Sequence, residues 1–142
     1  MDDATINYVI YIATTPENLW DTLTNPEALK KNWGIIESHW TVGSPVTEVS
    51  EAGRVLWKGA VLQSEPPRLL SFSFQVIGDV EATQVKFELS PRESFVGLTV
   101  TQLGFQLNSE LFQACARAWP QIMSSFKTYI ETGRSLRFAW KH

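Results

Sequence analysis

Residues 109–133, SELFQACARAWPQIMSSFKTYIETG, describe one long amphipathic helix. At about 100° per residue its apolar side chains fall within an arc of about 120°, and polar side chains fill the opposite side. The apolar set is Leu111, Phe112, Cys115, Trp119, Ile122, Met123, Phe126, Tyr129 and Ile130. Asn108 or Ser109 suits the N-cap and Gly133 suits the C-terminal end. Such a helix is about 36 Å long, so it spans a small domain.

Pro120 lies inside this stretch and cannot donate a backbone hydrogen bond to residue 116. The alternatives are one kinked helix, convex towards solvent, or two consecutive helices that break at Trp119. The apolar stripe runs through Pro120 without a phase change, which favours the single helix.

Most of the chain before this helix is predicted to be strand. A β-rich run at residues 6–12 is followed by two short helices, which open with Thr15-Pro16-Glu17 and Asn25-Pro26-Glu27. In each, a capping residue precedes proline at the first helical position. Turn signals then separate six further strands, predicted at residues 38–42, 46–50, 54–63, 69–76, 83–89 and 95–105. Their short connections favour antiparallel neighbours.

Composition narrows the classes of function. The chain of 142 residues is expected to form a single domain, residues 1–142. Twelve basic and fifteen acidic side chains give a formal charge of −3, which argues against a nucleic-acid binder. No signal peptide, membrane span or disulfide is expected, since the start lacks a positive region and there is one cysteine. We therefore expect a cytoplasmic protein without membrane association.

Six Trp and eight Phe are a large aromatic content for this length. Strand alternation turns alternate side chains of the predicted strands towards the helix, and Gly59 is expected to leave space there. Taken singly, each inward ring is best explained as core. As a set, they predict a cavity of a few hundred cubic ångströms between sheet and helix. The predicted ligand-binding residues are Trp33, Trp57, Phe72, Phe74, Phe87, Trp119, Met123 and Phe126.

Several segments resemble a known family. Residues 16–33, PENLWDTLTNPEALKKNW, look like the opening of the branch related to activators of the heat-shock-protein ATPase (AHSA-type). This branch belongs to the START-like, or SRPBCC, superfamily. Residues 59–74, GAVLQSEPPRLLSFSF, resemble its strand pair, residues 83–105 its next hairpin, and residues 118–133 its terminal helix.

The resemblance implies an α+β helix-grip fold. In this fold a curved antiparallel sheet of about seven strands wraps around a long C-terminal helix, and two short helices follow the first strand. Residues 34–55, GIIESHWTVGSPVTEVSEAGRV, match the branch only loosely. Because this region is expected to line or rim the cavity, the resemblance implies no particular ligand. Fold alone also decides no activity.

No catalytic or metal-binding set is legible. His39 is interpreted as an exposed strand residue, Glu48 as a carboxylate at the cavity rim, and Cys115 as a buried, inert thiol. One Cys and two His offer no metal-ligand cluster, and no cofactor motif is present. We therefore expect no catalytic residue, no metal and no cofactor.

These patterns, together with what the resemblance implies, suggest three functions. The first is binding of a small hydrophobic or aromatic molecule in the cavity. The second is a protein-interaction module related to chaperone ATPase activators, or a homodimer. The third, ranked last, is an enzyme of the cyclase or hydrolase kind. The basic tail, residues 134–142, with Phe138 and Trp140, either caps the cavity, packs on a second subunit or frays.

Overall fold

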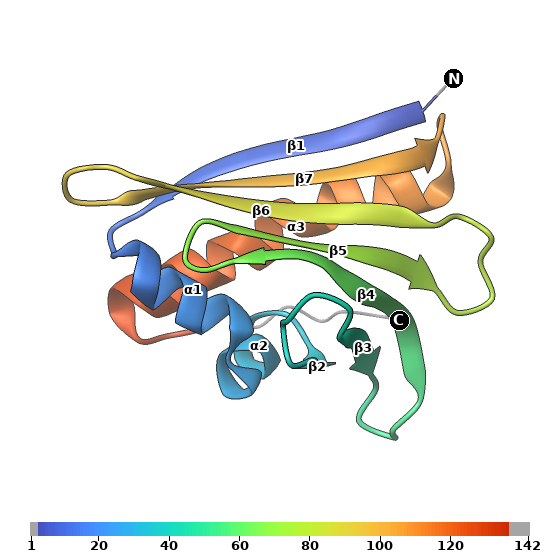
Figure 1. Cartoon of the computed structure of the whole chain (residues 1–142), viewed down its shortest axis with the longest axis horizontal. Helices are drawn as coiled ribbons and strands as arrows, with labels where there is room; N and C mark the ends of the chain where they lie inside the picture. Colours follow the sequence, from blue (N-terminus) through green and yellow to red (C-terminus); the bar gives the residue numbers. More distant parts are fainter. Residues whose placement is uncertain (1–2, 137–142) are drawn as a thin grey trace.

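The computed structural model describes residues 3–136. It contains a seven-stranded sheet in the order β1-β7-β6-β5-β4-β3-β2, and every neighbouring pair is antiparallel (Figure 1). The strands are β1 (Asp3–Ile12), β2 (Ile35–Glu37), β3 (Pro45–Val49), β4 (Val55–Glu65), β5 (Leu69–Val76), β6 (Thr83–Pro91) and β7 (Val96–Gln106). The predicted α+β helix-grip arrangement is confirmed.

Two short helices, α1 (Pro16–Thr24) and α2 (Pro26–Asn32), connect β1 to β2. Thr15 Oγ1 accepts from the backbone N–H of Asn18, and Asn25 Oδ1 accepts from the N–H groups of Glu27 and Ala28. These bonds satisfy donors that have no partner within the helix. Both predicted starts, a cap followed by proline, are confirmed.

Helix α3 (Glu110–Thr132) is a single helix that contains Pro120, as the unbroken apolar stripe predicted. Ser109 Oγ accepts from the backbone N–H of Phe112 at 3.0 Å. Gly133 ends the helix with φ 84°, a left-handed conformation that favours glycine. Its apolar stripe is fully buried only from Trp119 onward, at Trp119, Ile122, Met123 and Phe126.

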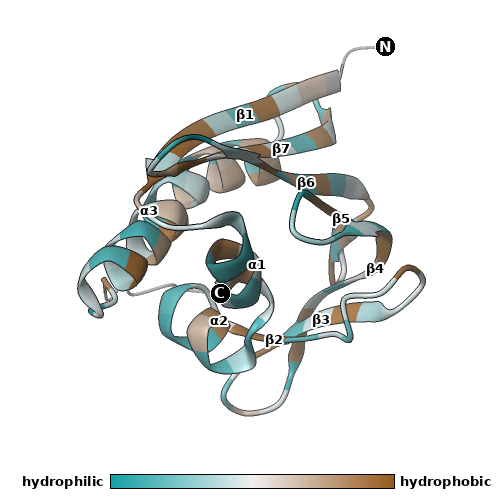
Figure 2. Cartoon of the chain, turned by 60° about the vertical axis from the view of Figure 1, so that its left-hand side comes forward, coloured by the Kyte–Doolittle hydropathy of each residue, from teal (hydrophilic) through white to brown (hydrophobic). Residues whose placement is uncertain are grey.

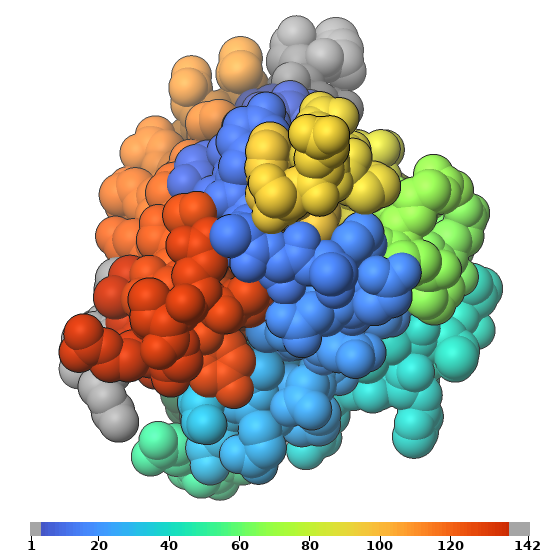
Figure 3. All heavy atoms as spheres, turned by 90° about the vertical axis from the view of Figure 1, so that its left-hand side faces the viewer, coloured from blue at the N-terminus to red at the C-terminus, as the bar shows by residue number. Residues whose placement is uncertain are grey.

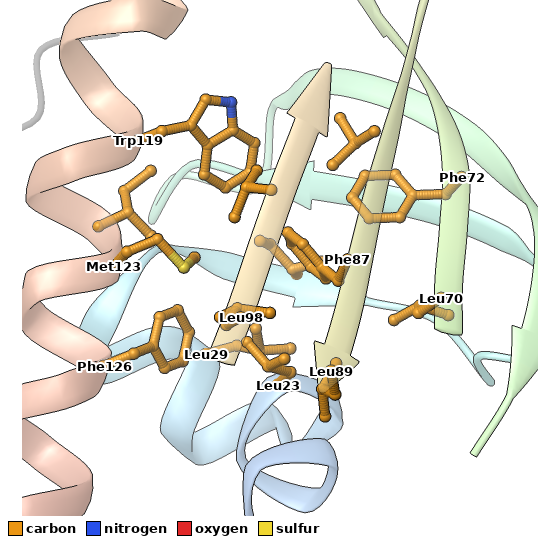
Figure 4. Packing of buried hydrophobic residues seen from close by; sticks show 14 of the residues in the cluster. Leu23, Leu29, Leu70, Phe72, Phe87, Leu89, Leu98, Trp119, Met123 and Phe126 are labelled. Atoms are coloured by element: carbon orange, nitrogen blue, oxygen red, sulfur yellow. The ribbon is translucent and has the colours of Figure 1, made fainter. Parts of the chain in front are cut away.

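The sheet curves around α3, so that its two edges lie on different sides of the helix. Figure 2 shows this arc from β1 to β2, with α1 and α2 near its open side. Helix α3 packs against β1 and β7. Trp119, Met123 and Phe126 point from α3 towards the rings of Phe72 and Phe87 on the sheet (Figure 4).

Three elements from different parts of the chain meet at one end of the molecule. There α1, the last turns of α3 and the β6–β7 turn lie together on the surface (Figure 3). Lys127 Nζ of α3 donates to the carbonyl of Tyr11 at 2.6 Å, and Glu131 accepts from the backbone N–H of Ala13 at 2.8 Å. These bonds attach the C-terminal half of α3 to the end of β1.

The predicted strand at residues 38–42 is wrong. The strand in this region is β2, Ile35–Glu37, which pairs with β3. The Ser44 hydroxyl lies 3.1 Å from that of Ser38 and accepts from the backbone N–H of His39 at 3.0 Å. Trp40 has φ 58°, which is incompatible with an extended strand. Residues 38–44 therefore form a turn stabilised by serine side chains.

No helix within residues 3–136 combines the length and apolar character that a bilayer crossing requires.

Candidate functional site

A cavity of about 740 Å³ lies between the N-terminal half of α3 and strands β4 and β5. It also reaches the end of α2, β3 and β7. Among the described residues its lining is Trp33, Glu48, Arg54, Val55, Leu56, Trp57, Phe74, Val76, Ile77, Gln102, Leu111, Ala114, Cys115, Arg117, Ala118, Trp119, Gln121 and Ile122. This is the place between sheet and helix where the sequence predicted a cavity.

The cavity has a simple steric origin. Helix α3 packs against β1 and β7, while the sheet carries β4 and β5 round to the other side of the arc (Figure 2). On the cavity side, the first turns of α3 present the small side chains of Ala114, Cys115 and Ala118. These short side chains leave space, whereas Met123 and Phe126, further along α3, are fully buried in the core.

Aromatic rings form the inner wall. Trp33, at the end of α2, packs edge-on against Trp119 with ring centroids 5.2 Å apart and stacks on Trp57 at 6.1 Å. Trp57 in turn packs against Phe74 at 4.5 Å. Offset and edge-to-face aromatic pairs have a favourable interaction energy beyond that of their buried area. The rings of the wall therefore stabilise one another's positions.

Both indole N–H groups in the buried part of the wall have acceptors. Trp57 Nε1 donates to Glu48 Oε1 at 2.6 Å, and Trp119 Nε1 donates to Gln102 Oε1 at 2.8 Å. Gln102 Nε2 donates onward to the Thr83 hydroxyl at 3.0 Å. The wall therefore contains two polar groups, a carboxylate and an amide, that are held in place by tryptophan.

The predicted ligand-binding residues fall into two groups. Trp33, Trp57, Phe74 and Trp119 line the cavity. Phe72, Phe87, Met123 and Phe126 have no solvent-accessible surface and lie in the core behind it (Figure 4). Ligand contact by the first four stays a prediction, and the second four support the wall from behind.

Sequence reasoning missed several lining residues. Gln102 shares the inner face of β7 with Val96, Leu98 and Val100, so alternation along the predicted strand contained the signal. Arg54, Arg117 and Gln121 are exposed and line the mouth. No local pattern distinguishes these three from ordinary surface residues.

The candidate polar residues take different positions. His39 is exposed, but in the turn after β2 and not in a strand. Glu48 is 3% exposed, which corrects its assignment to the rim. The reason is register: Glu48 lies opposite Trp57 on the inner face of the β3–β4 pair.

Cys115 lines the cavity and is half-buried. Burial raises the pKa of its thiol to about 11, against a smaller lowering effect of a hydrogen bond with Gln102. A thiol with this pKa is protonated at neutral pH and is a poor nucleophile. Among residues 3–136, no group of three His, Cys, Asp or Glu side chains is placed to hold a metal ion.

The sequence-based expectation that Gly59 leaves space in the cavity is wrong. A Cβ at this position would overlap the backbone carbonyl of Ser73 on β5. The Ser73 hydroxyl also accepts from the backbone N–H of Ala60 at 2.9 Å. Glycine is therefore required because two strands approach closely here.

A second, more polar hollow of about 620 Å³ adjoins the cavity. Trp33, Glu48 and Leu56 line both, and charged side chains of α2 and the β3–β4 turn surround the second one.

The prediction for the tail, residues 134–142, lies largely outside the described residues, since these end at Leu136. The backbone N–H of Leu136 donates to the Ser125 hydroxyl at 3.0 Å.

Comparison with known proteins identifies the relatives of this chain. The family described as "Activator of Hsp90 ATPase homolog 1-like protein" matches residues 13–131. No curated protein sequence matches the chain.

Three solved structures share the fold. Protein MLL2253 from Mesorhizobium loti superposes with a TM-score of 0.83 at 23% identity, over 90% of this chain and 97% of that one. The Aha1 dimer from Colwellia psychrerythraea gives 0.80 at 23% identity, over 93% and 99%. PFC0360w, an HSP90 activator from Plasmodium falciparum, gives 0.73 at 14% identity, over 91% and 96%.

Proposed function

The chain belongs to the family of Activator of Hsp90 ATPase homolog 1-like proteins, and from this premise we propose that it binds a small hydrophobic or aromatic molecule between its sheet and α3. The observation that carries the proposal is the cavity of about 740 Å³ with three tryptophans in its wall. Packed protein cores contain few voids larger than a water molecule. A space of this volume lies in the range that holds small ligands, about 300–1,000 Å³.

The chemistry of the wall supports an apolar occupant. Trp33, Trp57, Phe74 and Trp119 offer ring faces and edges, and Ile122 and Val76 add aliphatic surface. Removing apolar surface from water is favourable by about 25 cal/mol per Å², so a ring system inserted here gains affinity without a specific hydrogen bond. The indole N–H groups of Trp57 and Trp119 already have protein acceptors.

A second function, protein interaction, has its own support on the outer face of the sheet. Strand β1 is an edge strand, and Val9 and Tyr11 on it are 49% and 52% exposed. Tyr11 packs edge-on against Phe95, which is also exposed. Exposed apolar groups beside an unpaired strand edge suit a protein partner or a second copy. Two relatives are described as an Aha1 dimer and an HSP90 activator.

The deciding experiment is native mass spectrometry of protein purified without detergent. A small molecule that stays bound in the native spectrum and leaves on denaturation supports the cavity proposal. The same spectrum reports monomer or dimer. Protein with an empty cavity is then titrated with N-phenyl-1-naphthylamine, a neutral apolar dye that fluoresces when it leaves water.

A matched pair of variants locates the dye. Ala118→Phe places a ring into the cavity from α3, whereas Gln113→Phe adds the same ring to an exposed position of α3 outside the lining. We expect Ala118→Phe to weaken dye binding and Gln113→Phe to leave it unchanged. Absence of both an endogenous ligand and saturable dye binding would overturn the cavity proposal and leave the interaction function.

A further inference from the structure

The cavity has a cationic mouth. Its lining contains three charged residues among those described, Glu48, Arg54 and Arg117. Both arginines are exposed, whereas Glu48 is 3% exposed and lies in the wall. Positive charge therefore lies where the cavity meets solvent, on a chain whose formal net charge is −3.

The two guanidinium groups come from opposite sides of the mouth. Arg54 directly precedes β4, and Arg117 lies on α3. Ala114, Arg117 and Gln121 share one side of α3 because they are three and four residues apart. The two arginines thus reach the cavity lining from the sheet side and from the helix side.

Neither guanidinium has an ionic partner within residues 3–136. The ion pairs formed there are Arg68–Glu65, Lys86–Glu88 and Lys127–Glu131. The hydrogen bonds of Arg54 use its backbone: its N–H donates to the Ser50 hydroxyl and its carbonyl accepts from the Ser50 N–H. As far as residues 3–136 are concerned, the planar guanidinium donors of Arg54 and Arg117 are available for a carboxylate, sulfonate or phosphate.

The inner wall favours one orientation of such a molecule. Among the described lining residues, both cations lie at the mouth, and the charged residue in the buried part is Glu48, which accepts from Trp57 Nε1. Rings and aliphatic side chains form most of the remaining inner surface. An apolar body inside and an anionic group at the mouth satisfy both constraints.

We propose that the cavity takes an anionic amphiphile, a single molecule with an apolar or aromatic body and one acidic head held between Arg54 and Arg117. The inference rests on the proposed function, because it names the ligand class of the same cavity. The body occupies the space beside Trp33, Trp57 and Trp119, and the head stays partly in solvent.

Two dyes with the same rings test the inference separately from cavity binding. N-phenyl-1-naphthylamine is neutral, and 8-anilinonaphthalene-1-sulfonate adds one sulfonate to the same anilinonaphthalene. The double variant Arg54→Gln/Arg117→Gln removes both charges. Arg92→Gln removes a charge that is also exposed, in the β6–β7 turn and outside the cavity lining. Dissociation constants for both dyes are measured at low and high salt.

The expected result is a selective loss. The wild type binds the sulfonate dye more tightly than the neutral dye, by about three- to tenfold at low salt, as expected for two exposed charge pairs, and high salt reduces the difference. The double variant loses this preference but keeps its affinity for the neutral dye, and Arg92→Gln behaves as wild type.

Two other results would overturn the inference, and they have different consequences for the cavity proposal. If the neutral dye binds but the sulfonate gives no preference, or the preference survives in the double variant, the acidic head is wrong and the cavity proposal stands. If neither dye binds saturably, the cavity proposal fails and the inference fails with it.

Discussion

Trp57 and Glu48 lie directly opposite each other on β4 and β3, and the indole N–H of Trp57 donates to Glu48 Oε1 at 2.6 Å. Both side chains are buried, at 4% and 3% exposure. The register of β3 and β4 shifts immediately after Glu48. This shift places Val49 opposite Val55. The regular pairing of the two strands therefore ends at Glu48, whose side chain lies in the cavity wall.

Replacement of Glu48 by alanine is expected to lower the free energy of unfolding by about 1–3 kcal/mol, because the buried indole N–H of Trp57 loses its acceptor. Glu48→Gln keeps an oxygen at the same place and is expected to cost less. Urea unfolding at pH 7 measures both. Glu51→Ala, at an exposed position of the β3–β4 turn, is the control. Equal midpoints for Glu48→Ala and Glu51→Ala would contradict the assigned role of the bond.

Gly59→Ala is expected to lower the free energy of unfolding by about 1–3 kcal/mol or more, the range found for overpacked sites. The added Cβ overlaps the backbone carbonyl of Ser73, and neither strand can yield without loss of β4–β5 pairing. In Gly97→Ala the added Cβ meets the ring edge of Tyr11 at 3.2 Å, which a side-chain rotation relieves. Thermal unfolding of the two variants should rank Gly59→Ala lower, and the opposite ranking would refute this explanation.

Local sequence signals predicted the helices well because each helix end depends on neighbouring residues. Thr15 and Asn25 before proline, Ser109 at the start of α3 and Gly133 at its end occupy the capping positions that their chemistry suggests. The apolar stripe of residues 111–130 was sufficient to predict one helix through Pro120. Strand β5, Leu69–Val76, also has the predicted bounds.

Features that depend on contacts between strands were not predictable in the same way. Residues 38–42 contain β-formers, but Ser44 bonds to this segment and Trp40 adopts a positive φ. The burial of Glu48 follows from its register with Trp57, which the sequence does not state. The existence of the cavity was predicted from the number of rings. Its location beside Ala114 and Ala118 depends on the distance between α3 and β4, which local sequence patterns do not give.

Cys115 is expected to react slowly in the native protein. Burial raises the pKa of its thiol to about 11 from an unfolded value of 9.0. At pH 8 the thiolate fraction is then about a hundredfold lower in the native state than in the unfolded state. Alkylation by iodoacetamide, followed by intact mass, should be slower in buffer than in urea by about this factor.

The raised pKa of Cys115 also determines how the stability of the protein changes with pH. Since the folded pKa lies above the unfolded one, the protonated thiol contributes stability that is fully present below pH 9 and is lost as the pH rises towards 11. The native alkylation rate should therefore keep rising steeply between pH 8 and 10, where the rate of the unfolded chain levels off. Equal rates for native and unfolded protein at pH 8 would show that the native thiol is as accessible and as ionised as in the unfolded chain, and would contradict this prediction.

Glu131 is expected to stabilise the attachment of α3 to β1 only while it is ionised. Its Oε2 accepts from the backbone N–H of Ala13 at 2.8 Å and from Lys127 Nζ at 2.9 Å. The hydrogen bond from Ala13, followed by that from Lys127, lowers the pKa of Glu131 below its usual value of 4.5. For a carboxylate with a lowered folded pKa, the stability is present above pH 4.5 and is lost as the pH falls through the folded value.

Glu131→Gln should therefore lower the urea midpoint at pH 7 and have a smaller effect at pH 3, which lies below the unfolded pKa of 4.5, so that part of the stability from Glu131 is lost. The difference at pH 7 is expected to be below about 1 kcal/mol, because the side chain is partly solvated and exposed charge pairs are weak. Glu93→Gln, in the exposed β6–β7 turn, removes the same charge without these bonds and should show no such convergence. A Glu131→Gln effect that is constant from pH 7 to pH 3 would mean that the amide loses packing or geometry and not charge. The attachment of α3 to β1 would then not depend on ionisation of Glu131.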